Sequence, residues 1–254
     1  MAVQHTRLLA EALQLASRLG AKTREQGVAH VAYAVARRLV SPLAVPLYKQ
    51  TRQGWQFGYA GRKLPYFLHS YNTTWRNERA IEIPIVWEAV ERARGKRILE
   101  VGNVLSHYFD FEHDTLDKYE RVRGVINEDV IDFKPSAPYD LIVSISTLEH
   151  VGWDETPRDP SKVVQAIAAM TRWLAPGGEM IVTIPIGWND DLDEHLRRGT
   201  VKFGEQHCLK RVSADNRWAE TDWDDIAHAK YGVPFAESSC HMLFGIERAP
   251  STNG

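Results

Sequence analysis

The stretch Arg97-Ile98-Leu99-Glu100-Val101-Gly102-Asn103 decides the fold of this chain, together with two apolar segments that follow it. These segments cover residues 139–146 and 179–185, and Gly177-Gly178 leads into the second of them. Near-continuous apolar runs of this length are typical of strands buried on both faces of a parallel sheet. Residues 161–174, between the two segments, have apolar side chains at helical spacing. This alternation of strands and helix predicts an α/β fold.

Shorter segments complete the predicted organisation. Residues 115–117, 124–127, 206–212 and 241–248 are expected to be further strands, and residues 218–231 to be helical or irregular. Residues 6–19, 26–40 and 79–94 have helical periodicity. The segment 50–77 is rich in aromatic residues and glycine, so it is a poor helix and either covers a pocket or fills core space. We expect a seven-stranded, mostly parallel sheet flanked by helices, with a helical N-terminal extension.

Domain boundaries follow from these segments. Residues 1–78 are expected to be a helical and aromatic segment that acts as a lid or an interface, in the latter case in a homodimer. Residues 79–249 form the predicted α/β domain, and residues 250–254 a disordered tail.

Composition excludes several functional classes. The 254 residues carry a net charge of −2, so no bulk field attracts nucleic acid or an anionic membrane. Residues 1–20 contain charged side chains and no long apolar run, and prolines and arginines interrupt residues 27–48, so we expect neither a signal peptide nor a transmembrane segment. Cys208 and Cys240 lack metal-site spacing and are expected to be free thiols in a reducing compartment. These features predict a cytoplasmic protein.

Acidic residues end the first two predicted strands. Glu100 lies in the first strand, and Asp117 follows seventeen residues later at the end of the second. A carboxylate in this position can accept hydrogen bonds from both ribose hydroxyls, which suits a nucleoside-type cofactor at the carboxyl ends of parallel strands. The alternative for Asp117 is a solvated loop acid. A dinucleotide site is disfavoured because the turn after the first strand has no second glycine.

The whole pattern resembles the class I S-adenosylmethionine-dependent methyltransferases. In that family the first strand ends in an acid followed by three alternating glycines; in Glu100-Val101-Gly102-Asn103-Val104-Leu105-Ser106 only Gly102 is kept. The resemblance implies a Rossmann-like fold, S-adenosylmethionine as cofactor and S-adenosylhomocysteine as product. It assigns Asp129 to the adenine amino group, with Glu128 as the alternative, and Val130 to the face of the ring. The implied cofactor-binding residues are Glu100, Gly102, Asn103, Asp117, Asp129, Val130 and Ser146.

The same resemblance implies the catalytic residues. A Leu-Glu-His-Val segment, here residues 148–151, lies at the pocket mouth in many members of the family. Because imidazole titrates near neutral pH, His150 is a candidate general base, with Glu149 or Asp154 orienting it or the acceptor. The alternative is that His150 has a structural role. Some relatives bind a divalent ion through Glu-x-x-Glu-His, a run that Ser146 breaks here; His195 or His207 could complete a Mg²⁺ site, so the metal requirement stays open.

Segments 71–79, 100–108, 124–129 and 147–155 resemble a bacterial methyltransferase subgroup associated with polysaccharide and glycolipid assembly, including sugar O-methyltransferases of mycobacterial methylmannose polysaccharide synthesis. The subgroup implies a saccharide hydroxyl as methyl acceptor. Aromatic faces stack on pyranose C–H groups, and core packing is the alternative for each aromatic residue. The candidate substrate residues are Tyr71, Trp75, Trp153 and Trp188. Two other functions stay open: methylation of a non-sugar small molecule or a lipid-linked acceptor, and a non-catalytic cofactor-binding subunit of a glycan-assembly complex.

Overall fold

The computed structural model describes residues 46–236 and 238–251. The chain divides into two units, residues 1–53 and 54–254. In the first unit, residues 46–51 are helical. The predicted helices 6–19 and 26–40 lie outside the described residues, as do residues 252–254 of the predicted tail. The second unit begins at Gly54 and carries all the predicted site residues.

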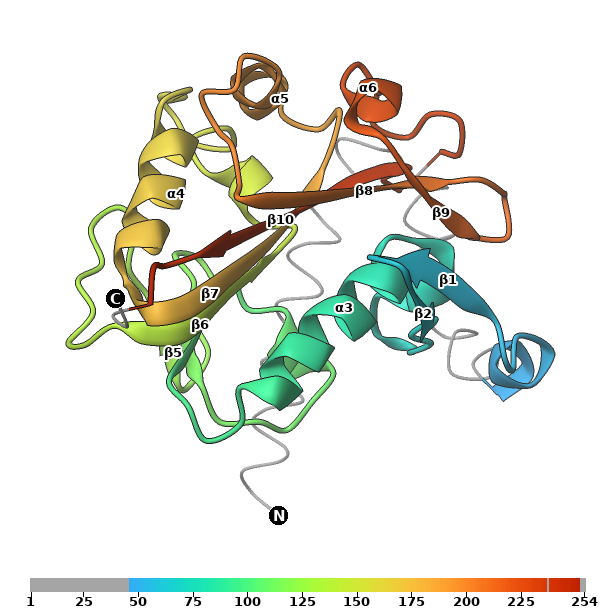
Figure 1. Ribbon diagram of the computed structural model, residues 1–254, viewed down its shortest axis with the longest axis horizontal. Helices are drawn as coiled ribbons and strands as arrows, with labels where there is room; N and C mark the ends of the chain where they lie inside the picture. Colours follow the sequence, from blue (N-terminus) through green and yellow to red (C-terminus); the bar gives the residue numbers. More distant parts are fainter. Residues whose placement is uncertain (1–45, 237, 252–254) are drawn as a thin grey trace. The chain divides into compact units, whose positions relative to one another are not determined.

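An eight-stranded sheet forms the centre of the second unit, in the order β5-β4-β3-β6-β7-β10-β8-β9 (Figure 1). Its strands are β3 (Ile98–Val101), β4 (Asp114–Leu116), β5 (Val125–Ile126), β6 (Tyr139–Ile145), β7 (Leu174–Pro185), β8 (Glu205–Arg211), β9 (Trp218–Thr221) and β10 (His241–Arg248). The pairs from β5 to β7 are parallel, whereas β10 is antiparallel to both β7 and β8. This order confirms the predicted Rossmann-like α/β fold.

Strand β9 corrects the predicted count of seven strands, because residues 218–221 were expected to be helical or irregular. β9 pairs antiparallel with β8, with Arg211 opposite Trp218. Trp218 is buried, whereas Glu220 in the same strand is exposed. Four residues are too few for an alternation of buried and exposed side chains to be recognised in a sequence. Residues 218–221 therefore become a strand through their pairing with β8.

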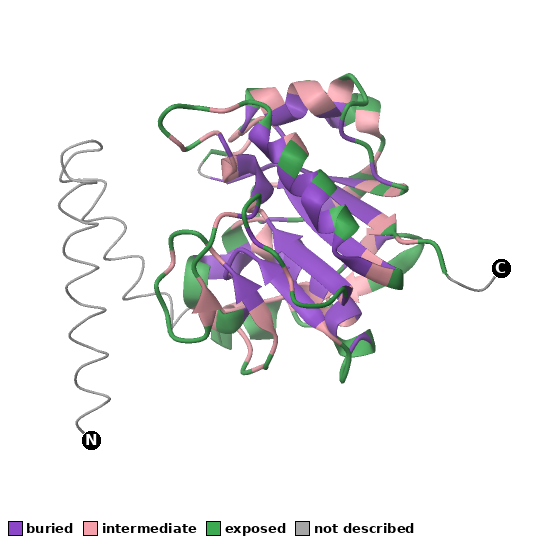
Figure 2. Cartoon of the chain, turned by 90° about the vertical axis from the view of Figure 1, so that its left-hand side faces the viewer, coloured by how far each residue is buried: buried purple, intermediate pink, exposed green. Residues whose placement is uncertain are grey.

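The sheet is covered on both faces. Helix α3 (Arg79–Arg92) packs on one face with Ile98, Val143 and Ile145, whereas α4 (Lys162–Arg172) packs on the other with Leu99 and Ile142. Neighbouring residues of one strand therefore belong to different cores, which explains the near-continuous apolar runs. α5 (Asp190–Arg197) and α6 (Trp223–Ile226) add side chains to the α4 side. Figure 2 shows the buried strands between more exposed helices.

Helix α3 contains a proline that does not break it. Pro84 has no N–H to donate to the carbonyl of Ala80, one turn earlier. The backbone N–H of Phe67 donates to that carbonyl instead, at 2.9 Å. The segment before α3 is thereby attached to the helix.

The aromatic segment forms a β-hairpin that the sequence analysis did not predict. Its strands are β1 (Gln56–Tyr59) and β2 (Arg62–Pro65), and the 3₁₀ segment η1 (Tyr71–Arg76) follows. Phe57 and Tyr59 are buried against Phe244 and Trp218 of the large sheet. These two rings therefore fill core space, which was one of the two alternatives for this segment.

Cys208 and Cys240 are buried free thiols, as predicted. Among the helices of the described residues, none combines the length and apolar character that crossing a bilayer requires.

Candidate functional site

The strand order has a switch point at the carboxyl ends of β3 and β6. The chain leaves β3 toward β4 and β5, whereas it leaves β6 toward β7, so the two neighbouring strands send their loops in opposite directions. Ligands of open α/β sheets bind at such a switch point. The turns after β3, β4, β6 and β7 therefore delimit the candidate site.

Gly102 brings two of these turns into contact. Its φ is +88°, a conformation that residues with a side chain rarely adopt. A Cβ added to Gly102 would lie 2.2 Å from Thr147 Oγ1, in the turn after β6. Glycine is therefore required here both by conformation and by space.

Glu100 holds the turn after β3 through hydrogen bonds to its backbone. This side chain is fully buried, and its Oε1 accepts hydrogen bonds from the backbone N–H groups of Val104 and Leu105 at 2.9 and 2.8 Å. Asn103 Oδ1 accepts from Ser106 Oγ at 2.5 Å. Glu100 thus acts on the shape of the turn, and a ligand would meet the backbone of the turn before this carboxylate.

Asp117 joins the turns after β3 and β4. Its Oδ2 accepts from the N–H of Asn103 at 3.2 Å, and its Oδ1 accepts from the N–H groups of Tyr119 and Glu120 at 2.8 and 2.7 Å. These contacts differ from those of a freely solvated loop acid. Its predicted role toward a ribose stays a prediction.

Asp129 belongs to a cluster of four charges. Its Oδ2 is 2.6 Å from Lys162 Nζ and 2.8 Å from Lys118 Nζ, and Glu155 binds the same two lysines at 2.6 and 3.1 Å. Burial raises the pKa of Asp129, but hydrogen bonds from the lysines outweigh it and the net pKa is lowered. The sequence analysis missed these partners, since nothing local marks Lys162. The next residue, Val130, is buried in the α4-side core.

Glu82 of α3 connects the helix to the ends of two strands. This side chain is fully buried. Its Oε1 accepts hydrogen bonds from the hydroxyl groups of Ser146 and Thr183, and its Oε2 pairs with Arg79. The predicted cofactor residue Ser146 therefore faces α3 with its hydroxyl. The sequence analysis missed Glu82 because it lies inside a helix without a recognisable motif.

Three carboxyl groups and Arg79 influence one another at this edge. Glu149 is 2% exposed, and its Oε2 has no hydrogen-bond partner among the described residues. Burial raises the pKa of Glu149 well above its ordinary value, Arg79 opposes the shift, and Glu82 and Glu78 add to it. Burial, followed by the charge of Glu82, also raises the pKa of Glu78. Burial therefore disfavours the ionised form of both carboxyl groups.

His150 and Asp154 form a hydrogen-bonded pair at the rim. His150 Nδ1 is 2.6 Å from Asp154 Oδ2, and the imidazole is 42% exposed. Since an ionised carboxylate only accepts hydrogen bonds, this contact places a proton on Nδ1. Nε2 lies 3.7 Å from Glu149 Oε1, beyond hydrogen-bond distance. The two other predicted catalytic residues, Glu149 and Asp154, therefore flank His150.

Trp188 and Tyr231 form an aromatic wall next to His150. Trp188 lies 5.5 Å from the His150 ring and 4.6 Å from the Tyr231 ring, centroid to centroid. Trp188 Nε1 and Tyr108 Oη are buried without a hydrogen-bond partner within the part of the chain that the structure describes. Buried polar atoms without protein partners are rare in folded proteins, so these two atoms are candidates for a hydrogen bond to a ligand. Burial raises the pKa of Tyr231 to about 12.

The other substrate candidates lie in different surroundings. Tyr71 is 43% exposed and stacks on His107 at 4.3 Å. Trp153 stacks under the guanidinium group of Arg158 at 3.3 Å. Trp75 is only 4% exposed, so little of its ring faces solvent. Among these candidates, Trp188 is in ring contact with His150.

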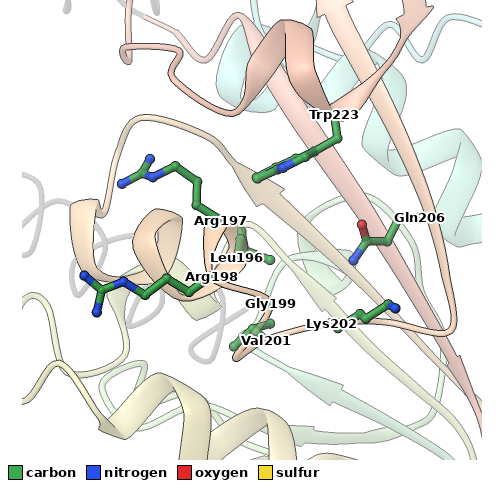
Figure 3. Close-up of a pocket in the computed structure, with 8 residues that line it drawn as sticks. All are labelled: Leu196, Arg197, Arg198, Gly199, Val201, Lys202, Gln206 and Trp223. Carbon is green, nitrogen blue, oxygen red and sulfur yellow. The ribbon is translucent and has the colours of Figure 1, made fainter.

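No grouping of three or more metal-ligating side chains occurs among the residues described. His195 Nε2 contacts the carbonyl of Pro160, and His207 Nε2 contacts Glu205, so neither joins His150 in the structure. A cavity of about 320 Å³ lies elsewhere, between the end of α5, β8 and Trp223 (Figure 3). Its lining includes none of the predicted site residues.

Comparisons with known proteins identify no family model and no curated relative that matches this chain. Solved structures that match part of this chain include the N-methyltransferase NodS from Bradyrhizobium japonicum in complex with S-adenosylhomocysteine (16% identity, 68% of this chain and 93% of that chain, TM-score 0.38). The sugar N-methyltransferase KedS8 from a Streptoalloteichus species is 15% identical over 75% of this chain and 96% of its own, with a TM-score of 0.34. A possible histamine N-methyltransferase from Thermotoga maritima is 14% identical over 62% and 85%, with a TM-score of 0.37. By its own strand order, the chain has a Rossmann-like α/β fold whose candidate site lies at the carboxyl ends of β3, β4, β6 and β7.

Proposed function

We propose that this protein is an S-adenosylmethionine-dependent methyltransferase that methylates a hydroxyl group of a saccharide. One observation carries the proposal: the His150–Asp154 pair lies next to the turn that Gly102 forms. Thr147 meets Gly102 directly, and the N–H of His150 donates to the carbonyl of Thr147 at 3.0 Å. A base and a cofactor-type turn therefore share one edge of the sheet.

The residues at this edge suit the proposed cofactor. S-adenosylmethionine, when bound, supplies a methyl group attached to a cationic sulfonium. Gly102 and Asn103 would contact the cofactor through their backbone, and Asp117 is the carboxylate nearest to them for the ribose hydroxyls. Asp129 would approach the adenine with Lys118 and Lys162 attached.

His150 would remove the proton from the acceptor. Its Nε2 has the lone pair for the hydroxyl proton, while Nδ1 keeps its hydrogen bond to Asp154. The carboxylate of Asp154 holds the orientation of the ring and stabilises the imidazolium that forms. Methyl transfer otherwise depends on alignment, which the contacts between the turns after β3 and β6 provide.

A saccharide acceptor fits the wall beside His150. Trp188 and Tyr231 offer apolar surface for pyranose C–H groups. A hydroxyl group that reached the buried Trp188 Nε1 or Glu149 Oε2 would form a hydrogen bond with an atom that has no partner among the described residues. A small-molecule or lipid-linked acceptor would use the same base. A turnover assay that compares these acceptors with saccharides distinguishes the two alternatives.

A non-catalytic, cofactor-binding subunit is the second candidate. Val104 and Ser106 replace two glycines of the family pattern, and two lysines hold the carboxylate of Asp129. Such a protein would bind S-adenosylmethionine without turnover on any acceptor.

The test combines binding and turnover. We expect S-adenosylhomocysteine to bind in calorimetry, and a panel of oligosaccharides to include an acceptor that is methylated. His150→Ala should lower kcat about 10²- to 10⁴-fold with unchanged cofactor affinity, whereas His195→Ala, on α5, serves as a matched control. Absence of S-adenosylhomocysteine binding, or a normal kcat for a folded His150→Ala protein, would overturn the proposal.

A further inference from the structure

A buried histidine that the proposed reaction does not use contacts Glu100, whose carboxylate also binds the turn after β3. The side chain of His113 is 3% exposed, and that of Glu100, its partner, is fully buried. His113 precedes β4, and Glu100 lies in the neighbouring strand β3, opposite Thr115. His113 Nε2 and Glu100 Oε2 are 2.7 Å apart.

The contacts of the imidazole determine how many protons the pair holds. His113 Nδ1 is 3.2 Å from the carbonyl oxygen of Phe111, which can only accept, so Nδ1 carries a proton. A contact of 2.7 Å between His113 Nε2 and Glu100 Oε2 requires a proton between these two atoms, because two lone pairs at this distance would repel each other. The contact between His113 Nε2 and Glu100 Oε2 therefore holds one shared proton.

The other oxygen of Glu100 holds the turn. Glu100 Oε1 accepts from the N–H groups of Val104 and Leu105, within the turn whose second and third family glycines are absent. Val104 has a φ of −111°, which a residue with a side chain adopts without strain. Hydrogen bonds to Glu100 thus define a turn that glycines define in the family pattern.

Aromatic packing keeps the imidazole in place. Phe111 stacks on the His113 ring at 4.6 Å with an interplanar angle of 21°, and Trp87 of α3 meets Phe111 edge to face at 5.6 Å. Thr115 Oγ1 lies 3.2 Å from Nε2, on the side of β4. The position of Glu100 Oε2 is therefore determined by a ring that has little freedom to move.

We propose that His113 is a positioning residue of the cofactor site: the proton that it shares with Glu100 fixes the carboxylate that shapes the turn after β3. The inference rests on the proposed function, since it assumes that this turn holds S-adenosylmethionine. Loss of the imidazole would leave Glu100 Oε2 buried without a donor, and the carboxylate would then reorient and release Val104 and Leu105.

The binding test compares three substitutions, with S-adenosylhomocysteine as the probe. His113→Phe keeps a flat ring but removes the donor, and we expect about tenfold weaker binding or worse in a folded protein. His113→Gln places an amide donor near the position of Nε2 and should bind within about threefold of the wild type. His195→Phe is the matched control, because His195 lies on α5, and its affinity should equal that of the wild type.

The outcomes separate the inference from the proposed function. If the wild type does not bind the probe, the proposed function fails and the inference fails with it. If the wild type binds and folded His113→Phe binds equally well, only the inference is overturned. Equal weakening in His113→Phe and His113→Gln would also overturn it, because a donor at this position would then be irrelevant.

A spectroscopic measurement covers the case in which His113→Phe does not fold. In ¹⁵N-histidine spectra of the wild-type protein, we expect the signal of His113 Nε2 to show a proton shared in a hydrogen bond with Glu100. A spectrum that shows no proton shared between His113 Nε2 and Glu100 would overturn the inference, whatever the affinity for the probe.

Discussion

A Cβ on Gly102 would lie 2.2 Å from the Oγ1 atom of Thr147, so the turn after β3 and the turn after β6 touch at a residue without a side chain. The contact joins the part of the site that would hold the cofactor to the segment that carries His150. Substitutions at this contact should therefore affect stability and binding together.

Gly102→Ala tests this contact. The substitution combines a left-handed backbone with overlap against the whole Thr147 side chain, and we expect a loss of about 2–4 kcal/mol in the free energy of unfolding. Gly95→Ala is the control, because Gly95 has a φ of +78° with nothing within 4 Å of an added Cβ. It should cost about 1 kcal/mol. Urea unfolding measures both, and equal losses would show that the overlap is unimportant.

Glu82→Gln tests the junction between α3 and the strand ends. Glutamine keeps an oxygen for Ser146 and Thr183 but leaves the partly buried Arg79 without its closest carboxylate. We expect a loss of about 3 kcal/mol in the free energy of unfolding. Glu88→Gln, on the same helix, removes a half-exposed ion pair with Arg62 and should cost less than about 1 kcal/mol. Comparable losses would contradict a special role for Glu82.

The raised pKa of Asp193 predicts that the stability of the protein depends on pH. Its Oδ2 accepts from the N–H of Gly187, next to Trp188, and burial raises its pKa from 3.8 to about 6. The folded state therefore holds this proton more tightly than the unfolded state, so the free energy of unfolding falls by up to about 3 kcal/mol as pH rises from about 4 to 6.

Asp193→Asn should remove this slope, because asparagine does not titrate. Asp191→Asn, at the neighbouring half-buried acid that pairs with Arg158, should keep it. Urea unfolding at several pH values between 4 and 7 measures the effect. An unchanged slope in Asp193→Asn would assign the pH dependence to other groups.

Trp188→Phe tests how the aromatic wall meets the acceptor. The substitution keeps an apolar ring and removes the buried N–H that has no partner among the described residues. We expect the acceptor KM to rise about five- to tenfold, since one hydrogen bond is lost, while S-adenosylhomocysteine affinity stays the same. An unchanged KM would mean that Trp188 contributes only its apolar surface.

The main strands and helices could be predicted from the sequence, because burial on two faces produces apolar runs and helix amphipathicity produces a 3.6-residue period. Strand β9 and the β1–β2 hairpin could not, since their short polar segments become strands through pairing and through the burial of Phe57 and Tyr59. Local composition does not specify such partners.

At the site, the sequence by itself determined where Glu100, Asp117 and the segment that carries His150 lie relative to the strands. Only the tertiary structure decided the partners of the site residues. Glu82 accepts a hydrogen bond from Ser146, Lys118 and Lys162 form ion pairs with Asp129, and His113 contacts Glu100. The physical reason is that periodicity records which face of an element is buried. The pairing of buried charges depends instead on which distant segments the packed sheet brings within hydrogen-bond distance.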